Sequence, residues 1–274
     1  MAEFILSAFA DEAGSSLAEQ IAALKENGIG YIEPRNIGGK GILTIPDEEL
    51  ITIKSELDKN GIRVNSLGSP IGKYPIEMPL ADHLIDLERA FRVCEILDTK
   101  NIRMFSFFIP KDHCASEYAT EVISRLKVMA ALAKERNIQL CHENEKGIYG
   151  SIASRCLEIH KTFPELKAVY DPANFIQCGQ DTKEGWEMLA PYVEYMHIKD
   201  AMPNGSVVPA GKGVGNLPYL LSEYKGEVLT VEPHLSVFEG FEQLEAAEKA
   251  KRGYCYPTRR AAFDAAVRAL KELI

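Results

Sequence analysis

Four segments in the second half of the chain place acidic and imidazole side chains directly after an apolar run. The segments read HENE, YDPANF, MHIKD and VEPH, at 142–145, 170–175, 196–200 and 231–234, and each carries at least one carboxylate or imidazole. A strand that only fills a core has no use for charged groups at its end, because burying an unpaired charge is costly. We therefore interpret these endings as parts of one functional site.

The donor types predict a divalent cation. Three carboxylates and one imidazole suit Mn²⁺, Mg²⁺ or Co²⁺, and Zn²⁺ is also compatible with them. Four protein ligands would leave roughly one or two positions open for substrate or water. Each residue alone also has a simpler interpretation, since a strand-end acid often caps a helix and a lone histidine is more often a core residue than a ligand. Their joint occurrence favours the metal site.

The sequence around these segments alternates short β-rich runs with longer stretches of helical period. The predicted strands cover residues 4–10, 31–35, 63–70, 101–110, 138–145, 166–175, 193–201 and 227–234. The predicted helices cover residues 15–28, 47–61, 83–98, 116–137, 151–163, 183–192, 216–225 and 259–274. Ser16 and Glu19 have the spacing of a capping box at the start of the first helix.

Strands that alternate with helices predict a parallel sheet covered by helices. Eight such units in about 250 residues fit an α/β fold of the TIM-barrel type, (β/α)₈. We predict one such domain over residues 1–274, with insertions at 202–215 and 235–259 and an extra helix at 239–253. The alternative, an open doubly wound sheet, would need a glycine-rich phosphate turn that FADEAGSS lacks.

A barrel would bring the four segments together. Chemistry in TIM barrels takes place at the C-terminal ends of the strands. Neighbouring strands lie about 4.8 Å apart, so the ends of four successive strands in a closed barrel can converge on one point.

Composition and charge limit the kinds of partner and the location that we expect for this protein. The net charge of −9 and the isoelectric point near 5.3 argue against a nucleic-acid partner. No apolar run approaches the roughly 20 residues of a membrane span. The first residues, MAEFILSAFADEAG, contain an apolar stretch that is too short for a secretory signal. The six cysteines are scattered without a CxxC pair, which indicates reduced thiols and a cytoplasmic protein. The sequence is compatible with a homo-oligomer and does not determine the oligomeric state.

These segments resemble the metal-site segments of the xylose-isomerase-like TIM barrels. YIEPR at 31–35 and the later GKGVGN loop extend the resemblance along the chain. That superfamily contains sugar and sugar-phosphate isomerases and epimerases, including the D-tagatose 3-epimerase group, together with endonuclease IV. In the epimerase group the metal is held by Glu, Asp, His and Glu from successive strands. The resemblance therefore implies the metal ligands Glu143, Asp171, His197 and Glu232.

The resemblance implies a metal-dependent isomerase or epimerase of a sugar or sugar phosphate. A bound cation could hold the carbonyl and hydroxyl oxygens of an α-hydroxy ketone and stabilise an enediolate. Glu143 and Glu232 would be the catalytic carboxylates on the two faces of the substrate, each also serving as a ligand.

Departures from the family pattern leave the substrate open. Where the epimerases carry a histidine, an arginine and a second glutamate, this chain has Asn174, Pro203 and Tyr149, and Lys212 replaces an acid in the glycine-rich loop. We predict substrate contacts from residues at the barrel mouth: Arg35, Asn174, Lys199 and His234. Arg35, Lys73 or Lys199 could meet a phosphate or carboxylate, or form a salt bridge instead. Earlier strand ends also carry Glu33, Ser66, Ser69, Arg103 and Ser106.

Three other functions fit the sequence less well. A dehydratase or lyase similar to inosose dehydratase would share the enediolate-type intermediate and expel hydroxide. An endonuclease IV-like nuclease would need a three-metal cluster with additional histidines, whereas this chain has six histidines and Asn174 at a family histidine position. A non-catalytic sugar-binding barrel would not need all four ligands.

Overall fold

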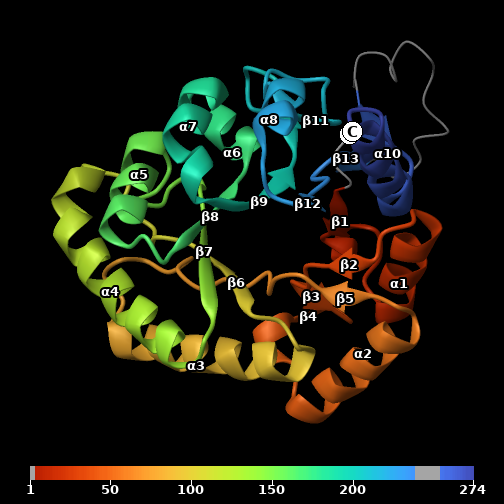
Figure 1. Cartoon of the computed structure of the whole chain (residues 1–274), viewed down its shortest axis with the longest axis horizontal. Coiled ribbons are helices and arrows are strands. Elements are labelled where there is room, and N and C mark those ends of the chain that lie inside the picture. The colour runs from red at the N-terminus through yellow and green to blue at the C-terminus, as the bar shows by residue number, and fades with distance from the viewer. Residues whose placement is uncertain (1–3, 238–253) are drawn as a thin grey trace.

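A computed structural model of the chain describes residues 4–237 and 254–274. The strands lie at the centre of the molecule and the helices form a ring around them (Figure 1). The predicted extra helix at 239–253 falls outside the described residues.

Eight parallel strands close a barrel. Six of them form one sheet in the order β1 (Ile5–Ala8), β12 (Val228–Val231), β9 (Val193–Ile198), β8 (Lys167–Tyr170), β7 (Gln139–Glu143), β6 (Asn101–Met104). The remaining pair is β2 (Tyr31–Ile32) and β5 (Arg63–Val64). Backbone hydrogen bonds join this pair to both edges, from Glu33 N to Ala8 O at 3.1 Å and from Leu67 N to Asn101 O at 2.8 Å. The predicted TIM barrel is confirmed.

The helices that cover the barrel follow the predicted pattern. They are α1 (Leu17–Glu26), α2 (Asp47–Lys59), α3 (Leu80–Leu97), α4 (Ala119–Glu135), α5 (Ala153–Thr162), α7 (Thr182–Leu189), α8 (Leu217–Glu223) and α10 (Arg259–Lys271). Ser16 and Glu19 make both hydrogen bonds of the capping box at the start of α1. Within the two described ranges, none of the helices is both long enough and apolar enough to cross a bilayer.

Smaller elements occupy the connections. They are the strands β3 (Asn36–Ile37), β4 (Lys40–Gly41), β10 (Asp200–Ala201), β11 (Val207–Val208), β13 (Ser236–Val237) and β14 (Cys255–Tyr256), and the 3₁₀ helices Ala10–Glu12, Ile42–Thr44, Ala115–Tyr118 and Ala190–Tyr192. The strands β10 and β11 form an antiparallel pair, with β11 inside the predicted insertion at 202–215.

All eight strands of the barrel are shorter than the sequence predicts. The strand predicted at 166–175 ends at Tyr170, and α6 (Pro172–Gln177) follows it. Asp171 caps this helix, accepting a hydrogen bond from the backbone N–H of Asn174 at 2.9 Å, and Pro172 occupies its first turn. Both features favour a helix start. The strand predicted at 101–110 likewise ends at Met104.

The glycine-rich loop after β11 is folded around one buried carboxylate. The backbone N–H groups of Gly211 and Gly213 donate to Oδ2 of Asp200 at 3.0 and 2.9 Å. Those of Gly215 and Ala201 donate to Oδ1 at 2.8 Å each. Hydrogen bonds to an ionised acceptor are roughly twice as strong as neutral ones. The loop is thereby fixed to the end of β9, next to the candidate site.

We expect Gly213→Ala to destabilise the protein by roughly 1–3 kcal/mol. A Cβ at this position would lie 2.3 Å from the carbonyl oxygen of Ala201 and 2.4 Å from Oδ1 of Asp200, so backbone would have to move. Gly30→Ala is the matched control, because a Cβ there meets nothing within 4 Å. Urea denaturation measures both free energies of unfolding. Equal values for the two variants would show that the packing around Asp200 does not constrain the loop.

Candidate metal and substrate site

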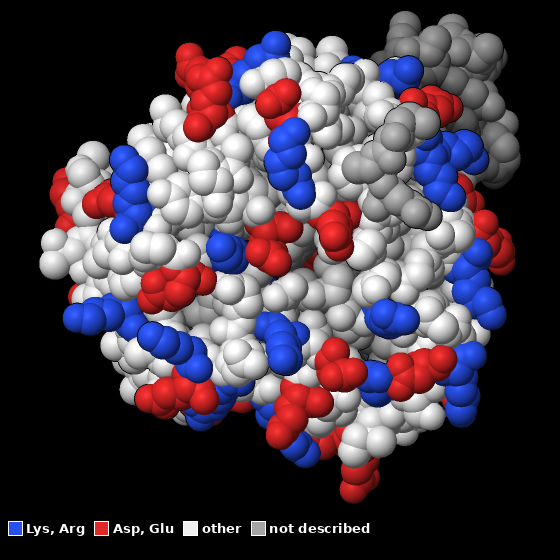
Figure 2. Space-filling view, viewed as in Figure 1, with Lys and Arg blue, Asp and Glu red and all other residues white. Residues whose placement is uncertain are grey.

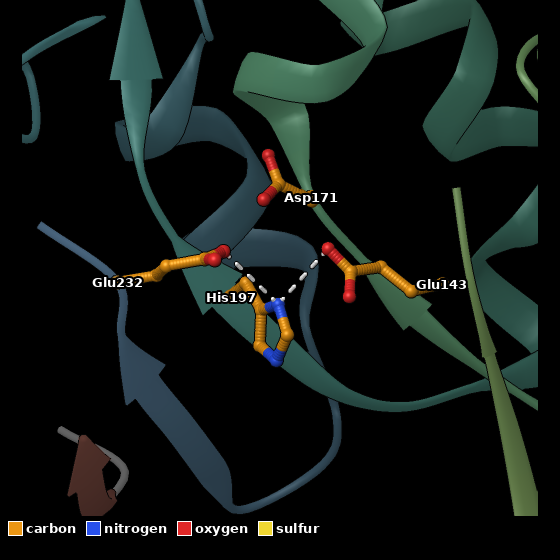
Figure 3. A group of neighbouring side chains, drawn as sticks. All are labelled: Glu143, Asp171, His197 and Glu232. Carbon is orange, nitrogen blue, oxygen red and sulfur yellow. Dashed lines mark ion pairs between the residues drawn. The ribbon is translucent and has the colours of Figure 1, made fainter. Parts of the chain in front are cut away.

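Four side chains from consecutive strands of the sheet meet at the C-terminal end of the barrel (Figure 3). Glu143 ends β7, Asp171 follows β8, His197 lies in β9 and Glu232 follows β12. One possible ligand atom from each lies within 4.8 Å of the others, and all four side chains are buried. The structure thus brings together the four residues that the sequence singles out, which remain predicted ligands.

The centre of this group fits a cation. Nδ1 of His197 lies 3.3 Å from Oε1 of Glu143 and 3.3 Å from Oε2 of Glu232, as the dashed lines in Figure 3 mark. This nitrogen is buried and has no hydrogen-bond partner among the residues described. An unsatisfied buried polar atom is unfavourable, and coordination to a metal would satisfy it. Three carboxylates and one imidazole are a suitable donor set for a divalent transition metal.

The second ring nitrogen of His197, Nε2, contacts an acid from across the barrel. Nε2 of His197 lies 3.3 Å from Oε2 of Glu33, which directly follows β2 and is fully buried. The hydroxyl of Tyr195 contacts Oε1 of Glu33 at 2.9 Å and Oγ of Ser66 at 3.0 Å. The sequence identifies Glu33 and Ser66 only as polar strand-end residues and misses Tyr195. Because side chains two apart in a strand share a face, Tyr195 could have been grouped with His197.

A lysine ammonium bridges two of the predicted ligands. Nζ of Lys199 lies 2.8 Å from Oδ2 of Asp171 and 3.0 Å from Oε2 of Glu232. Burial alone would lower the pKa of Lys199, but the charges of these two carboxylates raise it above its ordinary value. Burial raises the pKa of Asp171 to about 7, against the opposing charge of Lys199. Lys199 therefore offsets part of the negative charge gathered here.

Glu143 is oriented by two further side chains. Nη1 of Arg103 lies 3.3 Å from Oε2 of Glu143, and Nδ2 of Asn174 donates to Oε1 at 3.0 Å. Burial would raise the pKa of Glu143, but His197 and Arg103 lower it to about 2. For Glu232, burial again acts upward, and Lys199 and His197 hold its pKa well below the ordinary value. Both glutamates are therefore ionised near neutral pH.

A cavity of about 240 Å³ lies beside the two glutamates. Its lining includes Glu143 and Glu232 and the basic residues Arg35, Lys73, Arg103 and His234, whereas Asp171 and His197 do not line it. Figure 2 shows acidic and basic side chains around a hollow near the middle of one face of the molecule. Two of the four predicted ligands can thus reach a molecule bound in the cavity.

The predicted substrate-binding residues occupy two kinds of position. Arg35 and His234 line the cavity, at 3.6 and 3.3 Å from Oε1 of Glu232. Asn174 and Lys199 instead contact the carboxylates of the metal-ligand group; both are buried, and neither lines the cavity. Their roles in substrate binding stay predictions.

The cations proposed for an anionic group of the substrate already have acidic partners. Arg35 lies 3.0 Å from Asp11, and Lys73 lies 2.9 Å from Glu145. Lys199 is paired as described above. The salt-bridge alternative therefore describes all three in this structure.

Comparison with known proteins identifies the same architecture. The sequence profile of the xylose isomerase-like TIM barrel family matches residues 21–250. No curated protein matches the chain in sequence.

Solved structures that are similar over nearly their whole length include the following three. The structure of IOLI protein with a bound zinc atom has a TM-score of 0.74 at 16% identity, and the match covers 100% of this chain and 98% of the IOLI chain. The probable 3-DHS dehydratase AsbF from Bacillus anthracis has a TM-score of 0.73 at 16% identity, with 98% of each chain covered. A D-tagatose 3-epimerase-like protein has a TM-score of 0.72 at 16% identity, and the match covers 100% of this chain and 97% of that protein. At these identities the likeness shows the fold.

Proposed function

The chain belongs to the xylose isomerase-like TIM barrel family, and from that premise we propose that it is a divalent-metal-dependent isomerase or epimerase of a sugar or sugar phosphate. The observation that carries the proposal is the division of the ligand group. Glu143 and Glu232 line the cavity, whereas Asp171 and His197 do not. This division suits two carboxylates that act on the substrate and two side chains that only hold a cation.

Each glutamate has one oxygen on the ligand side and one near the cavity. Oε2 of Glu232 contacts His197 and Lys199, whereas its Oε1 faces the cavity-lining Arg35 and His234. For Glu143, Oε1 faces His197 and Oε2 faces Arg103, which lines the cavity. One carboxylate can therefore serve both as a ligand and as an acid or base.

The proposed reaction is proton transfer next to a carbonyl group. When bound, Mn²⁺, Mg²⁺, Co²⁺ or Zn²⁺ would polarise the carbonyl and hydroxyl oxygens of the substrate and stabilise the charge that develops on them. One glutamate removes the proton from the hydroxyl-bearing carbon next to the carbonyl group, leaving an enediolate. The other glutamate returns a proton to the opposite face for epimerisation, or to the neighbouring carbon for isomerisation. Glu143 and Glu232 are ionised near neutral pH in the free protein, as the residue that takes the proton requires. The residue that returns a proton must first acquire one from solvent.

Solvent exchange tests the proposal before the natural substrate is known. Ketoses, their phosphates and inosose-like compounds would be incubated in D₂O with protein and Mn²⁺. We expect deuterium to enter a C–H next to the carbonyl of at least one compound, and metal-stripped protein should give none. Deuterium detected by NMR without loss of water supports isomerase or epimerase chemistry. A product that has lost one water would instead identify a dehydratase, and an absence of both outcomes would contradict the proposal.

A further inference from the structure

A buried carboxylate stands on the side of His197 that faces away from the other predicted ligands. Glu33 is fully buried, and its Oε2 lies 3.3 Å from Nε2 of His197. Among the described residues, His197 is the only basic side chain that forms an ion pair with Glu33. Because burying a carboxylate is costly, its retention at this point needs a compensating role.

Glu33 lies where it can hold the form of the imidazole that binds a metal. A cation held by Nδ1 of His197 would leave the imidazole neutral with its proton on Nε2, and the Glu33 carboxylate accepts the hydrogen bond of that N–H. The lone pair then belongs to Nδ1, the nitrogen that lies 3.3 Å from both glutamates. The ring of Phe9 packs edge-on against the imidazole at a centroid distance of 5.1 Å, which restricts its rotation.

Glu33 is in turn held by two hydroxyl groups. Tyr195 donates to Oε1 of Glu33 at 2.9 Å, and its oxygen lies 3.0 Å from Oγ of Ser66. All four groups of this chain, from Ser66 through Tyr195 and Glu33 to His197, are buried. These four residues come from three strands, because Glu33 follows β2, Ser66 follows β5, and Tyr195 and His197 both lie in β9. The barrel itself therefore sets their spacing.

We propose that Glu33 is a positioning residue for the metal. It selects the tautomer of His197, fixes the ring and increases the basicity of Nδ1, with Tyr195 and Ser66 holding its carboxylate in place. The inference rests on the proposed metal-dependent function but concerns metal binding and not turnover. Carboxylates that accept a hydrogen bond from a ligating histidine contribute about 10–100-fold to metal affinity in other sites.

The inference predicts a selective effect among metals. Co²⁺ and Zn²⁺ depend more on a nitrogen donor than Mg²⁺ and Mn²⁺, which prefer oxygen. Loss of Glu33 should therefore weaken Co²⁺ binding more than Mg²⁺ binding. General distortion of the site would weaken both alike.

Titration calorimetry on the full chain, with CoCl₂ and MgCl₂ as probes, tests this. We expect Glu33→Gln to raise the Kd for Co²⁺ by about 10–100-fold and the Kd for Mg²⁺ by less. Tyr195→Phe leaves Glu33 in place without its hydroxyl partner and should raise the Kd for Co²⁺ by a smaller factor. Tyr195→Phe also tests the inference by itself if Glu33→Gln does not fold.

Ser7→Ala is the matched control. It removes a partly buried hydrogen bond of 2.6 Å to Asn65 inside the same barrel without touching His197, so the Kd values for both metals should stay unchanged. The inference is overturned if the wild type binds no Co²⁺, if the Kd for Co²⁺ is unaffected by the Glu33 and Tyr195 substitutions, or if both metals weaken equally. Failure of the deuterium exchange with these affinity changes intact would reject the isomerase proposal alone.

Discussion

Glu232→Gln should lower turnover by about 10²–10⁴-fold even when the metal is saturating. The amide oxygen of glutamine can still coordinate a cation, but an amide cannot accept the proton of the substrate. In the structure Oε2 of Glu232 lies among the ligands, and Oε1 lies 3.3 Å from the cavity-lining His234. The substitution should therefore separate the two functions of one carboxylate. We expect the same pattern for Glu143→Gln.

His197→Ala provides the contrast. His197 does not line the cavity, so its loss should weaken metal binding, and excess Mn²⁺ should partly restore turnover. Rates would be measured across Mn²⁺ concentrations, with the compound that shows solvent exchange as substrate. Full recovery of Glu232→Gln turnover in excess Mn²⁺ would contradict the two-glutamate mechanism and leave the metal site standing.

Removal of the metal should abolish turnover and lower the thermal stability. A cation at about 100 times its Kd stabilises the native state by about 2.7 kcal/mol. For a chain of this size that corresponds to roughly 5–10 °C in Tm. The physical reason lies in the buried carboxylates of Glu143, Asp171 and Glu232, which Lys199 and Arg103 neutralise only in part. Scanning calorimetry of chelator-treated protein, before and after addition of metal, measures the shift.

His197→Ala also controls this experiment, since one lost ligand should reduce the metal-induced rise in Tm. Metal analysis of protein purified without chelator gives an independent measure of occupancy. A Tm that does not respond to Mn²⁺, Co²⁺ or Zn²⁺ in the wild type would count against a metal site.

The barrel and its four-residue group could be predicted because both follow local rules. Alternation of strand and helix signals determines the order of the elements, and strand-end residues gather at one end of a parallel barrel. The sequence also predicts the start of α1, since Ser16 and Glu19 lie within one helical turn.

Other features depend on contacts that form only when the barrel closes. Glu33 and His197 are 164 residues apart, and nothing in either segment indicates that they are partners. The sequence predicts the end of β8 too late, because the run LKAVYDPANF continues into α6, where Asp171 serves as the cap. Such pairings follow from three-dimensional packing and not from sequence spacing.

The loop around Asp200 has a consequence for recognition. Backbone N–H groups that converge on one point form an anion-binding nest, the device with which many proteins hold phosphate. Here the anion is part of the chain, because the Asp200 carboxylate accepts the N–H groups of Gly211, Gly213 and Gly215. An external phosphate would have to displace a carboxylate that is already bonded and tethered. The nest is self-occupied, so this glycine-rich loop acts as a rigid support for the end of β9 and not as a phosphate cradle.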